Sequence, residues 1–572
     1  MPTQAARRRV RTWQVVVLWL VCMAPLLGWG LPTSRYGAYL FGGDPPWDAA
    51  RYGADEAAQL RRERRAGADT DLDPLAGAER IIDLTADDAA RAAILLRYRL
   101  YSRQPDEMIT FQALQRMNPR ALDFDPCLYQ YGGAYIYLIG AVLAAASWLG
   151  LLTLTSDVGV YLEQPELFAR FYVVARAVTL LFGALTLAAA VRLARRGAGR
   201  AAGWVALVLA AAAAVFISDV VEAKPHLLSA GLLLWATLSA LDYAADGRRR
   251  DALRMGLLTG GAVGLVPTGL AGVLLWPALL LARGGQRRRA GCDLLLGGLL
   301  LAAVYAATNP YVVYNLLFGR AALASNLANS LAMYSVARLP AGLLRVGQLL
   351  LESCGAGVLS IGCVALLWLG RHWPRRLIVA AAPGLALLAL CSAIGAGKPA
   401  EFARFLLLPA LLLAIAAAVA IAAVAARRPA LGLLLLVAAL SLMRTPAYLR
   451  SLAIDTRFDH ESRHQAAAYL RDHAAPGDAI GLIQVPAPYA TPPLDFAHRR
   501  VLLLPPQALP DDECRDLPTW LVLTADDQAA HAQAWWQQHY QLIASFAADP
   551  LWLSRISWAN KPVLVYRRAT GG

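Results

Sequence analysis

Residues 405–428 read FLLLPALLLAIAAAVAIAAVAARR, an uninterrupted apolar run that ends in two arginines. A helix over 405–425 is long enough to cross a hydrocarbon core of about 30 Å. Similar runs recur along the 572 residues, of which 58% are hydrophobic, and the mean hydropathy is +0.45. This pattern excludes a soluble protein and predicts a polytopic α-helical membrane protein.

The net charge of +14 has the same explanation. In a soluble domain it would suggest a nucleic-acid partner, but here the arginines gather in short links between apolar runs. That distribution is the one that orients membrane helices, so we predict a lipid bilayer and no nucleic acid as partner. The arginine-rich links, which should all face the cytoplasm, are 192–200, 248–254, 283–289, 371–376 and 427–428.

Between consecutive cytoplasmic links the chain must leave and return, which predicts about eleven spans. The first, at 15–31, follows a basic N-terminus that should be cytoplasmic. The others are predicted at 171–192, 201–217, 226–243, 254–266, 269–282, 292–308, 350–369, 377–395, 405–425 and 430–445. The chain then divides into a transmembrane domain over 1–450, which includes an extracytoplasmic loop at 32–133, and an extracytoplasmic domain over 451–572. We expect the protein in the inner (plasma) membrane.

Two apolar segments fit this count less simply. The segment 254–282 has cytoplasmic charges at both ends and few residues, so it predicts a tight or re-entrant hairpin broken at Val266-Pro267-Thr268-Gly269. The run 134–154 has external flanks on both sides. With four tyrosines at its start it favours an interfacial helix, and a full span is the alternative.

The two external regions differ in kind. In the first loop, residues 48–100 fit either two amphipathic helices or irregular chain. The region after 451 alternates helix-like and strand-like stretches, which predicts a small α/β domain. Helices are expected at 460–473 and 526–540, and strands at 479–484, 500–504, 520–524 and 562–567. The histidines of this domain lack metal-ligand spacing and are interpreted as surface residues.

None of the predicted spans carries an acidic residue or a lysine near its middle, which argues against an ion-coupled transporter. The polar residues gather instead at the outer ends of helices. A carboxylate there can act as a base, and cations can hold a phosphate leaving group. Four clusters supply both kinds of group: 105–133 with Asp106, Glu107 and Tyr131; 218–226 with Asp219, Lys224 and His226; Asn309-Pro310-Tyr311; and 398–405 with Arg404.

The order of these features resembles the GT-C superfamily of integral-membrane glycosyltransferases. The resemblance rests on the first span, the acidic pair, the aromatic-Gly start of the next helix at Tyr131-Gly132-Gly133, Arg176, the 218–226 cluster and Asn309-Pro310-Tyr311. Arg404 with Leu408-Pro409 completes it. Within the superfamily the chain is similar to the branch of dolichyl-phosphate-mannose-protein mannosyltransferases and aminoarabinose transferases.

The resemblance implies a glycosyltransferase that moves a sugar, with inversion, from a polyprenyl-phosphate donor to a lipid, glycan or protein acceptor on the extracytoplasmic face. Asp106 best matches the acidic position of the family, and Glu107 is the next candidate for the base. Asp219 matches the acidic position of the later loop. Lys224, His226 and Arg404 would face the lipid phosphate, with Tyr131 also in the substrate site. The chain departs from the family in the long insert before Asp106 and at Pro267-Thr268, where relatives often carry a cation.

Other interpretations stay open. The chain is alternatively a transporter or flippase of a lipid-linked sugar, or a catalytically silent homologue. The acidic pair also suits the N-terminus of a solvated helix, and Lys224 and His226 suit a headgroup contact. Asp123 and Asp125 form an Asp-x-Asp pattern that fits either a turn or a metal site. We predict no cofactor, with a divalent cation as the alternative.

Overall fold

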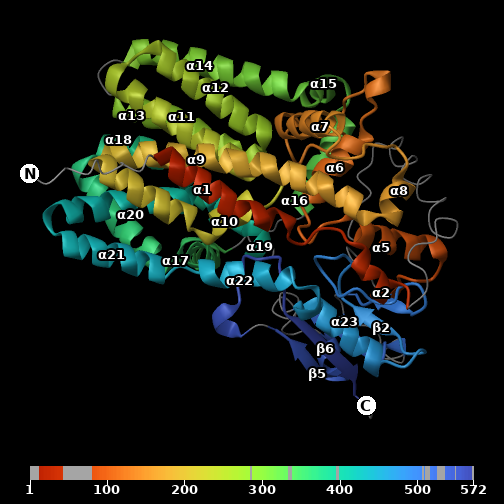
Figure 1. Ribbon diagram of the computed structural model, residues 1–572. Helices are drawn as coiled ribbons and strands as arrows, with labels where there is room; N and C mark the ends of the chain where they lie inside the picture. Colours follow the sequence, from red (N-terminus) through yellow and green to blue (C-terminus); the bar gives the residue numbers. More distant parts are fainter. Residues whose placement is uncertain are drawn as a thin grey trace, which may run out of the picture.

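The computed structural model describes residues 12–42, 80–283, 287–332, 336, 338–394, 399–505, 508, 516–524, 535–547 and 549–569. Most of its long helices, such as α9 (Pro165–Ala211), α12 (Arg249–Leu265), α14 (Arg287–Thr308) and α20 (Leu407–Arg427), run alongside one another, and a small sheet domain lies beside this bundle (Figure 1). The architecture is therefore that of a helical membrane protein with a small C-terminal α/β domain, as the sequence predicts.

Among the described residues, seven helices are long and apolar enough to cross a membrane. Three shorter apolar helical segments, Trp13–Gly28, Gly133–Trp148 and Pro267–Ala282, accompany them. The seven are Pro165–Ala211, His226–Asp246, Ala290–Thr308, Leu339–His372, Pro374–Ala393, Ala403–Arg427 and Pro429–Asp455. They coincide with predicted spans, while the total of eleven stays a prediction.

Two of these helices are broken at glycines. Helix α9 (Pro165–Ala211) leaves helical geometry at Ala198 and at Gly199, where φ is +74°. This break falls inside the arginine-rich link 192–200, so α9 corresponds to two predicted spans joined by a sharp turn. Helix α17 (Leu339–His372) is broken at Gly355, where φ is +81°, a conformation that glycine adopts without the strain of a side chain.

Small residues allow close packing within the bundle. Helices α12 (Arg249–Leu265) and α14 (Arg287–Thr308) approach so closely at Gly256 that an added Cβ would overlap the backbone of Gly297. Close backbone approach through glycine and alanine is the usual packing device of membrane helices, where lipid and side chains are equally apolar.

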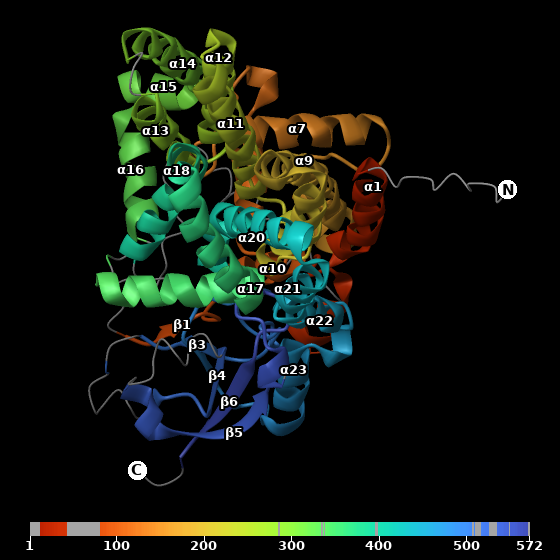
Figure 2. The same cartoon turned by 90° about the vertical axis from the view of Figure 1, so that its left-hand side faces the viewer.

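Helix α7 (Gly133–Trp148) lies across the direction of the long helices. In Figure 1 it is seen nearly end-on while α9 is seen from the side, and in Figure 2 the two are reversed. Its far end is exposed, with Trp148 87% accessible. This orientation agrees with the interfacial helix that the sequence favours over a span.

The segment 254–282 forms the expected interrupted hairpin. Helix α12 ends at Leu265, Val266 is extended, and the chain continues as the 3-10 helix η4 (Pro267–Leu274) and as α13 (Leu275–Ala282). Gly269 packs so closely on the backbone of Ala262 that a Cβ would not fit between them. The break therefore falls at the predicted Val266-Pro267.

The C-terminal domain is built on a six-stranded mixed sheet in the order β1-β3-β2-β4-β6-β5. The parallel core of β2 and its neighbours follows the predicted strands, and helix α23 (Ser462–His473) matches the predicted helix. The strands are β1 (Ile82–Asp83), β2 (Ile480–Leu482), β3 (Val501–Leu503), β4 (Trp520–Thr524), β5 (Tyr540–Phe546) and β6 (Val563–Arg568).

Two strands of this sheet were not expected. Strand β1 comes from the loop predicted at 32–133 and pairs with β3, so that loop contributes to the C-terminal sheet. Strand β5 follows a predicted helix whose residues 526–534 lie outside the described part of the chain. Its last residues, Trp535–His539, form a 3-10 helix. Six residues of β5 then pair antiparallel with β6 across an irregularity between Leu542 and Ala544.

The remaining helices complete the bundle and its outer face. They are α1 (Thr12–Met23), α2 (Gly37–Leu40), α5 (Asp88–Leu100), α6 (Glu107–Arg116), α8 (Val158–Glu163), α10 (Ala214–Val220), α11 (His226–Asp246), α15 (Pro310–Phe318), α16 (Arg320–Ala332), α18 (Pro374–Ala393), α19 (Pro399–Phe402), α20 (Leu407–Arg427), α21 (Pro429–Ser441) and α22 (Thr445–Asp455). Of the loop segment 48–100, residues 48–79 lie outside the described part of the chain.

Candidate active site

The acidic pair lies at the start of helix α6. The backbone N–H groups of both Asp106 and Glu107 donate to the side-chain oxygen of Gln104, at 2.7 and 3.1 Å. These bonds satisfy two donors that a helix start leaves open. The backbone of both acidic residues is thereby fixed at the helix start, and both side chains are buried.

Glu107 is fully satisfied by buried partners. Arg176 of α9 contacts it through two nitrogens, with Nε at 2.8 Å from one oxygen and Nη2 at 2.7 Å from the other. The Ser102 hydroxyl and the Ala223 backbone N–H also donate to it, at 2.5 and 2.6 Å. A carboxylate with four donors and no exposure has a structural role, which argues against the interpretation of Glu107 as a base.

Arg176 also contacts the segment that follows α1. Its Nη1 donates to the carbonyl oxygens of Leu27 and Trp29, at 2.7 and 2.6 Å, and its guanidinium lies 5.2 Å from the Trp29 ring centre. The first span, the acidic loop and α9 thus meet at one arginine.

Asp106 has a different environment. Its carboxylate forms an ion pair with Nη1 of Arg404, which belongs to the 3-10 turn η5 (Ala403–Leu406) before α20. Within the described part of the chain, Nε of Arg404 has no hydrogen-bond partner. Asp106 and Arg404 therefore form a carboxylate and cation pair in which the N–H group at Nε of the arginine is not used by any described residue. Lys398, from the same sequence cluster, lies outside the described residues.

The 218–226 link brings further charges beside Glu107. Lys224 pairs with Glu222 at 2.5 Å, and both side chains are buried. Burial alone would lower the pKa of Lys224, but the neighbouring carboxylates Glu222 and Asp219 outweigh burial and raise it. Among the described residues, one oxygen of Asp219 has no hydrogen-bond partner. Glu222 is a member of this cluster that the sequence interpretation did not select.

His226 and Tyr131 join the clusters through their rings. His226 begins α11, and its ring centre lies 6.0 Å from that of Tyr131 and 5.6 Å from that of Phe405. Phe405 in turn lies under the Arg404 guanidinium at 5.0 Å. The chain Tyr131, His226, Phe405, Arg404, Asp106 is thus continuous, although its members come from four separate segments.

Asn309 positions the start of α7. Its side-chain oxygen accepts from the Gly133 backbone N–H at 2.7 Å, and its amide nitrogen donates to the Gly264 carbonyl at 3.3 Å. Gly132 lies so close to Gly264 that an added Cβ would overlap its backbone. Helix α14 ends at Thr308 and α15 begins at Pro310, so this asparagine stands at a helix boundary and acts as a structural link.

A large apolar cavity of about 1250 Å³ lies beside α6. The face of α6 with Met108, Phe111 and Gln115 lines it, and so do residues of α7, α8 and α9. Tyr137 and Tyr311 supply polar groups at its wall. The cavity is large enough for a lipid chain, since small-molecule sites typically measure roughly 300–1000 Å³.

Asp123 and Asp125 act as turn residues. Asp123 accepts from the backbone N–H of Asp125, while Asp125 accepts from that of Cys127 and from the Tyr129 hydroxyl at 2.7 Å. Among the described residues, no group of three or more His, Cys, Asp or Glu side chains is arranged to hold a metal ion. The geometry favours the turn interpretation of the Asp-x-Asp pattern.

The chain resembles solved structures along nearly its whole length. ArnT from Cupriavidus metallidurans in the apo state matches 97% of this chain and 98% of its own, at 14% identity and a TM-score of 0.41. The structure of the same protein bound to undecaprenyl phosphate matches at 15% identity and a TM-score of 0.41. Archaeal oligosaccharyltransferase AglB from Archaeoglobus fulgidus, in complex with an inhibitory peptide and a dolichol-phosphate, covers 84% of this chain and 70% of its own at 13% and 0.37.

No protein-family model matches the chain, and no curated protein matches it. Likenesses at these identities and TM-scores do not establish an activity.

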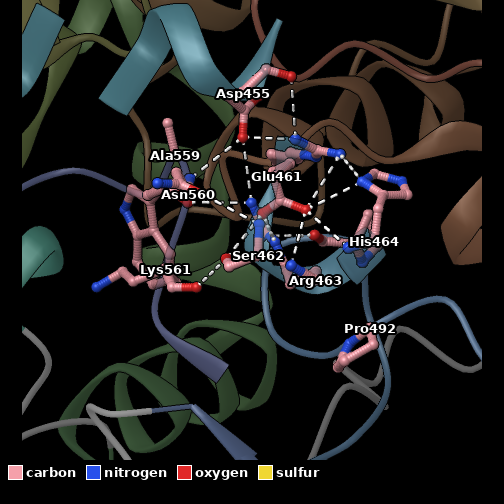
Figure 3. A network of polar contacts seen from close by, with 12 residues as sticks. Asp455, Glu461, Ser462, Arg463, His464, Pro492, Ala559, Asn560 and Lys561 are labelled. Atoms are coloured by element: carbon pink, nitrogen blue, oxygen red, sulfur yellow. Dashed lines mark hydrogen bonds and ion pairs between the residues drawn. The ribbon is translucent and has the colours of Figure 1, made fainter. Parts of the chain in front are cut away.

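A second buried charge network connects the acidic loop to the C-terminal domain. Arg103, three residues before Asp106, contacts Asp455 at 2.5 Å and the Tyr36 hydroxyl at 3.1 Å. Asp455 and Glu461 also hold Arg463, at 3.3 and 2.5 Å (Figure 3). The loop that carries the candidate base is thereby attached to the start of the C-terminal domain.

His464 belongs to this network, and its interpretation as a surface residue was wrong. Its side chain is 1% exposed, and its Nδ1 lies 3.0 Å from Glu461 (Figure 3). Glu461 is the N-cap residue of α23 and His464 lies three positions after it, so both side chains are on the same side of the helix start. The sequence signal was available in part, because Glu461-Ser462-Arg463-His464 places opposite charges at the start of a helix.

The network predicts loss of stability in acid. Burial would raise the pKa of Glu461, but Arg463 and Arg103 outweigh it and hold that pKa well below its usual value of 4.5. Burial lowers the pKa of His464 from 6.5. For both groups the pKa in the folded protein lies below the pKa in the unfolded chain. Their contribution to the stability of the fold is therefore complete above pH 6.5. The contribution of His464 decreases as the pH falls below 6.5, and that of Glu461 as it falls below 4.5. We expect the thermal unfolding midpoint to fall from pH 7 to pH 4.

Glu461→Gln tests the assignment. The variant should unfold at a lower temperature than the wild type at pH 7 and should depend less on pH. Equal slopes of midpoint against pH for both proteins would contradict the role of Glu461.

Proposed function

We propose that this chain is a membrane glycosyltransferase that transfers a sugar from a polyprenyl-phosphate donor to an acceptor on the extracytoplasmic face. The observation that carries the proposal is the buried Asp106–Arg404 ion pair. A base and a phosphate-binding cation are the two groups that such a transfer requires. The family resemblance of the sequence supports the same reaction class.

In this proposal Asp106 is the base that accepts the proton of the acceptor hydroxyl. Arg404 binds the phosphate of the donor through its available Nε and is drawn away from Asp106 as the donor enters. The Asp106 carboxylate thus loses its ion pair with Arg404 only when the donor is bound, and it can then accept a proton. The bond between the sugar and the phosphate breaks, the acceptor oxygen bonds to the sugar carbon with inversion, and polyprenyl phosphate leaves.

Lys224 and His226 complete the phosphate site, and Tyr131 packs beside them. The apolar cavity beside α6 accommodates a lipid chain close to these groups. The acceptor class stays open, since lipid, glycan and protein acceptors all present a nucleophile that a carboxylate can deprotonate.

The test is turnover of a panel of polyprenyl-phosphate sugars by the purified protein in lipid, with free polyprenyl phosphate detected by mass spectrometry. Release from at least one donor that Asp106→Asn abolishes would support the proposal. If no donor is cleaved by folded protein, a transporter of a lipid-linked sugar or a silent homologue becomes the better interpretation.

We expect the affinity for the donor to depend on pH through Asp219. Burial raises its pKa to about 7, against the opposing charge of Lys224, so Asp219 loses its proton as the pH rises through 7. Its negative charge then competes with the donor phosphate for Lys224. Since the donor is a phosphodiester whose own charge is constant there, we expect its KM to rise above pH 7.

Asp219→Asn should flatten this dependence, because asparagine is neutral at every pH. The measurement is the KM of the donor between pH 6 and pH 8.5 for both proteins. The same rise in the variant would assign the titration to another group.

A further inference from the structure

A second cavity lies between helices at the end of the bundle opposite to the candidate active site. It has a volume of about 670 Å³ and is bounded by α9, α11, α17, α18 and α20. Asp242 at its mouth and His226 in the candidate active site stand at opposite ends of α11. At 1.5 Å per residue, about 24 Å separate the two levels. The mouth of this cavity is therefore remote from the proposed active site, while its inner end reaches Pro409, five residues after Arg404.

The wall of this cavity is apolar and has room for a chain. Leucines and alanines line most of it, among them Leu366, Leu369, Ala380, Leu412 and Ala416. Gly384 keeps the space open, since an added Cβ would lie 2.6 Å from the Leu412 side chain. Along α18 the lining extends from Arg376 to Leu388, a rise of about 18 Å, which reaches beyond the middle of a bilayer core of about 30 Å.

The mouth of the cavity is cationic. Arg196, Arg375 and Arg376 line it, together with one acidic residue, Asp242. Asp242 is already paired with Arg196 at 2.7 Å. Within the described part of the chain, the side chains of Arg375 and Arg376 form no hydrogen bond or ion pair. Two guanidinium groups thus stand without a counter-charge at the open end of an apolar groove, beside Trp373, an aromatic residue suited to the headgroup level.

We propose that this groove is a binding site for an anionic phospholipid of the leaflet that contacts the arginine-rich links. One acyl chain lies along α18 between α17 and α20, and the headgroup phosphate lies between Arg375 and Arg376. A free anion would leave the apolar wall uncovered. A zwitterionic lipid has no net charge and would leave the excess of two positive charges uncompensated, whereas an anionic lipid reduces this excess to one. Basic pockets between membrane helices on the cytoplasmic side are suited to such headgroups.

The test is lipid binding by the full chain in nanodiscs with phosphatidylglycerol or phosphatidylcholine of identical acyl chains, followed by native mass spectrometry after release. The wild type should retain phosphatidylglycerol in preference to phosphatidylcholine by about tenfold or more, because each arginine near the surface contributes about 1 kcal/mol toward an anionic lipid. Arg375→Gln with Arg376→Gln should remove this preference. Gly384→Leu, which fills the groove, should reduce retention of both lipids.

The matched control is Arg371→Gln with Arg427→Gln, which removes two exposed arginines of the same bundle end that do not line the cavity. This variant should keep the wild-type preference. Equal retention of the two lipids by the wild type, or an equal loss of preference in the control and in the Arg375/Arg376 variant, would overturn the proposal. An unchanged thermal unfolding midpoint establishes that each variant is folded.

Discussion

Replacing Asp106 by asparagine is expected to reduce sugar transfer by about 100-fold or more, the usual effect of removing a general base. The amide retains the shape of the carboxylate but cannot accept the acceptor proton. The backbone bond from Asp106 to Gln104 is unaffected by the change, so α6 should begin at the same residue. The measurement is release of polyprenyl phosphate under saturating donor, compared with the wild type.

Two controls separate lost chemistry from lost structure. Asp472→Asn removes a carboxylate of an exposed ion pair in the C-terminal domain and should leave turnover unchanged. Asp106→Asn combined with Arg404→Gln removes both charges of the buried pair, which should recover any stability lost in the single variant but not the activity. If Asp106→Asn alone retains turnover near the wild-type rate, the base is another carboxylate, with Asp219 the next candidate.

Replacing Glu107 by glutamine is expected to destabilise the fold by about 3 kcal/mol or more, because it leaves Arg176 as a buried charge without its counter-ion. Both residues are fully buried, and Arg176 also holds the carbonyl oxygens of Leu27 and Trp29. Loss of the pair should therefore loosen the first span against α9. The measurement is the free energy of unfolding in detergent, obtained from thermal or denaturant unfolding curves.

The matched control for this change is Glu163→Gln, an exposed glutamate at the end of α8 that should alter stability little. Turnover per folded molecule gives the second measurement. Glu107→Gln should keep most of it, whereas Asp106→Asn should not. A stable Glu107→Gln protein without turnover would reverse the assignment of the two acids.

Much of the fold follows from local sequence pattern. The apolar runs predicted the long helices, Val266-Pro267 predicted the break in the hairpin, and alternating stretches predicted strands β2, β3, β4 and β6. These features are set by burial and backbone geometry within a few residues, so periodicity and proline reveal them. Strand β1 was missed because two residues in a long loop carry no such pattern. Strand β5 was missed because its residues are mostly exposed.

The sequence alone determined that this is a helical membrane protein whose polar groups gather at helix ends, because hydropathy and charge distribution are properties of the chain itself. Only the tertiary structure separated Asp106 from Glu107, which are neighbours in sequence and identical in charge. Arg176 and Ala223 hold one of them in a closed network, and Arg404, 298 residues away, meets the other. The same holds for His464 and for the cavity at Arg375 and Arg376. Such roles depend on which distant segments come together, and packing between helices, rather than any local pattern, decides that.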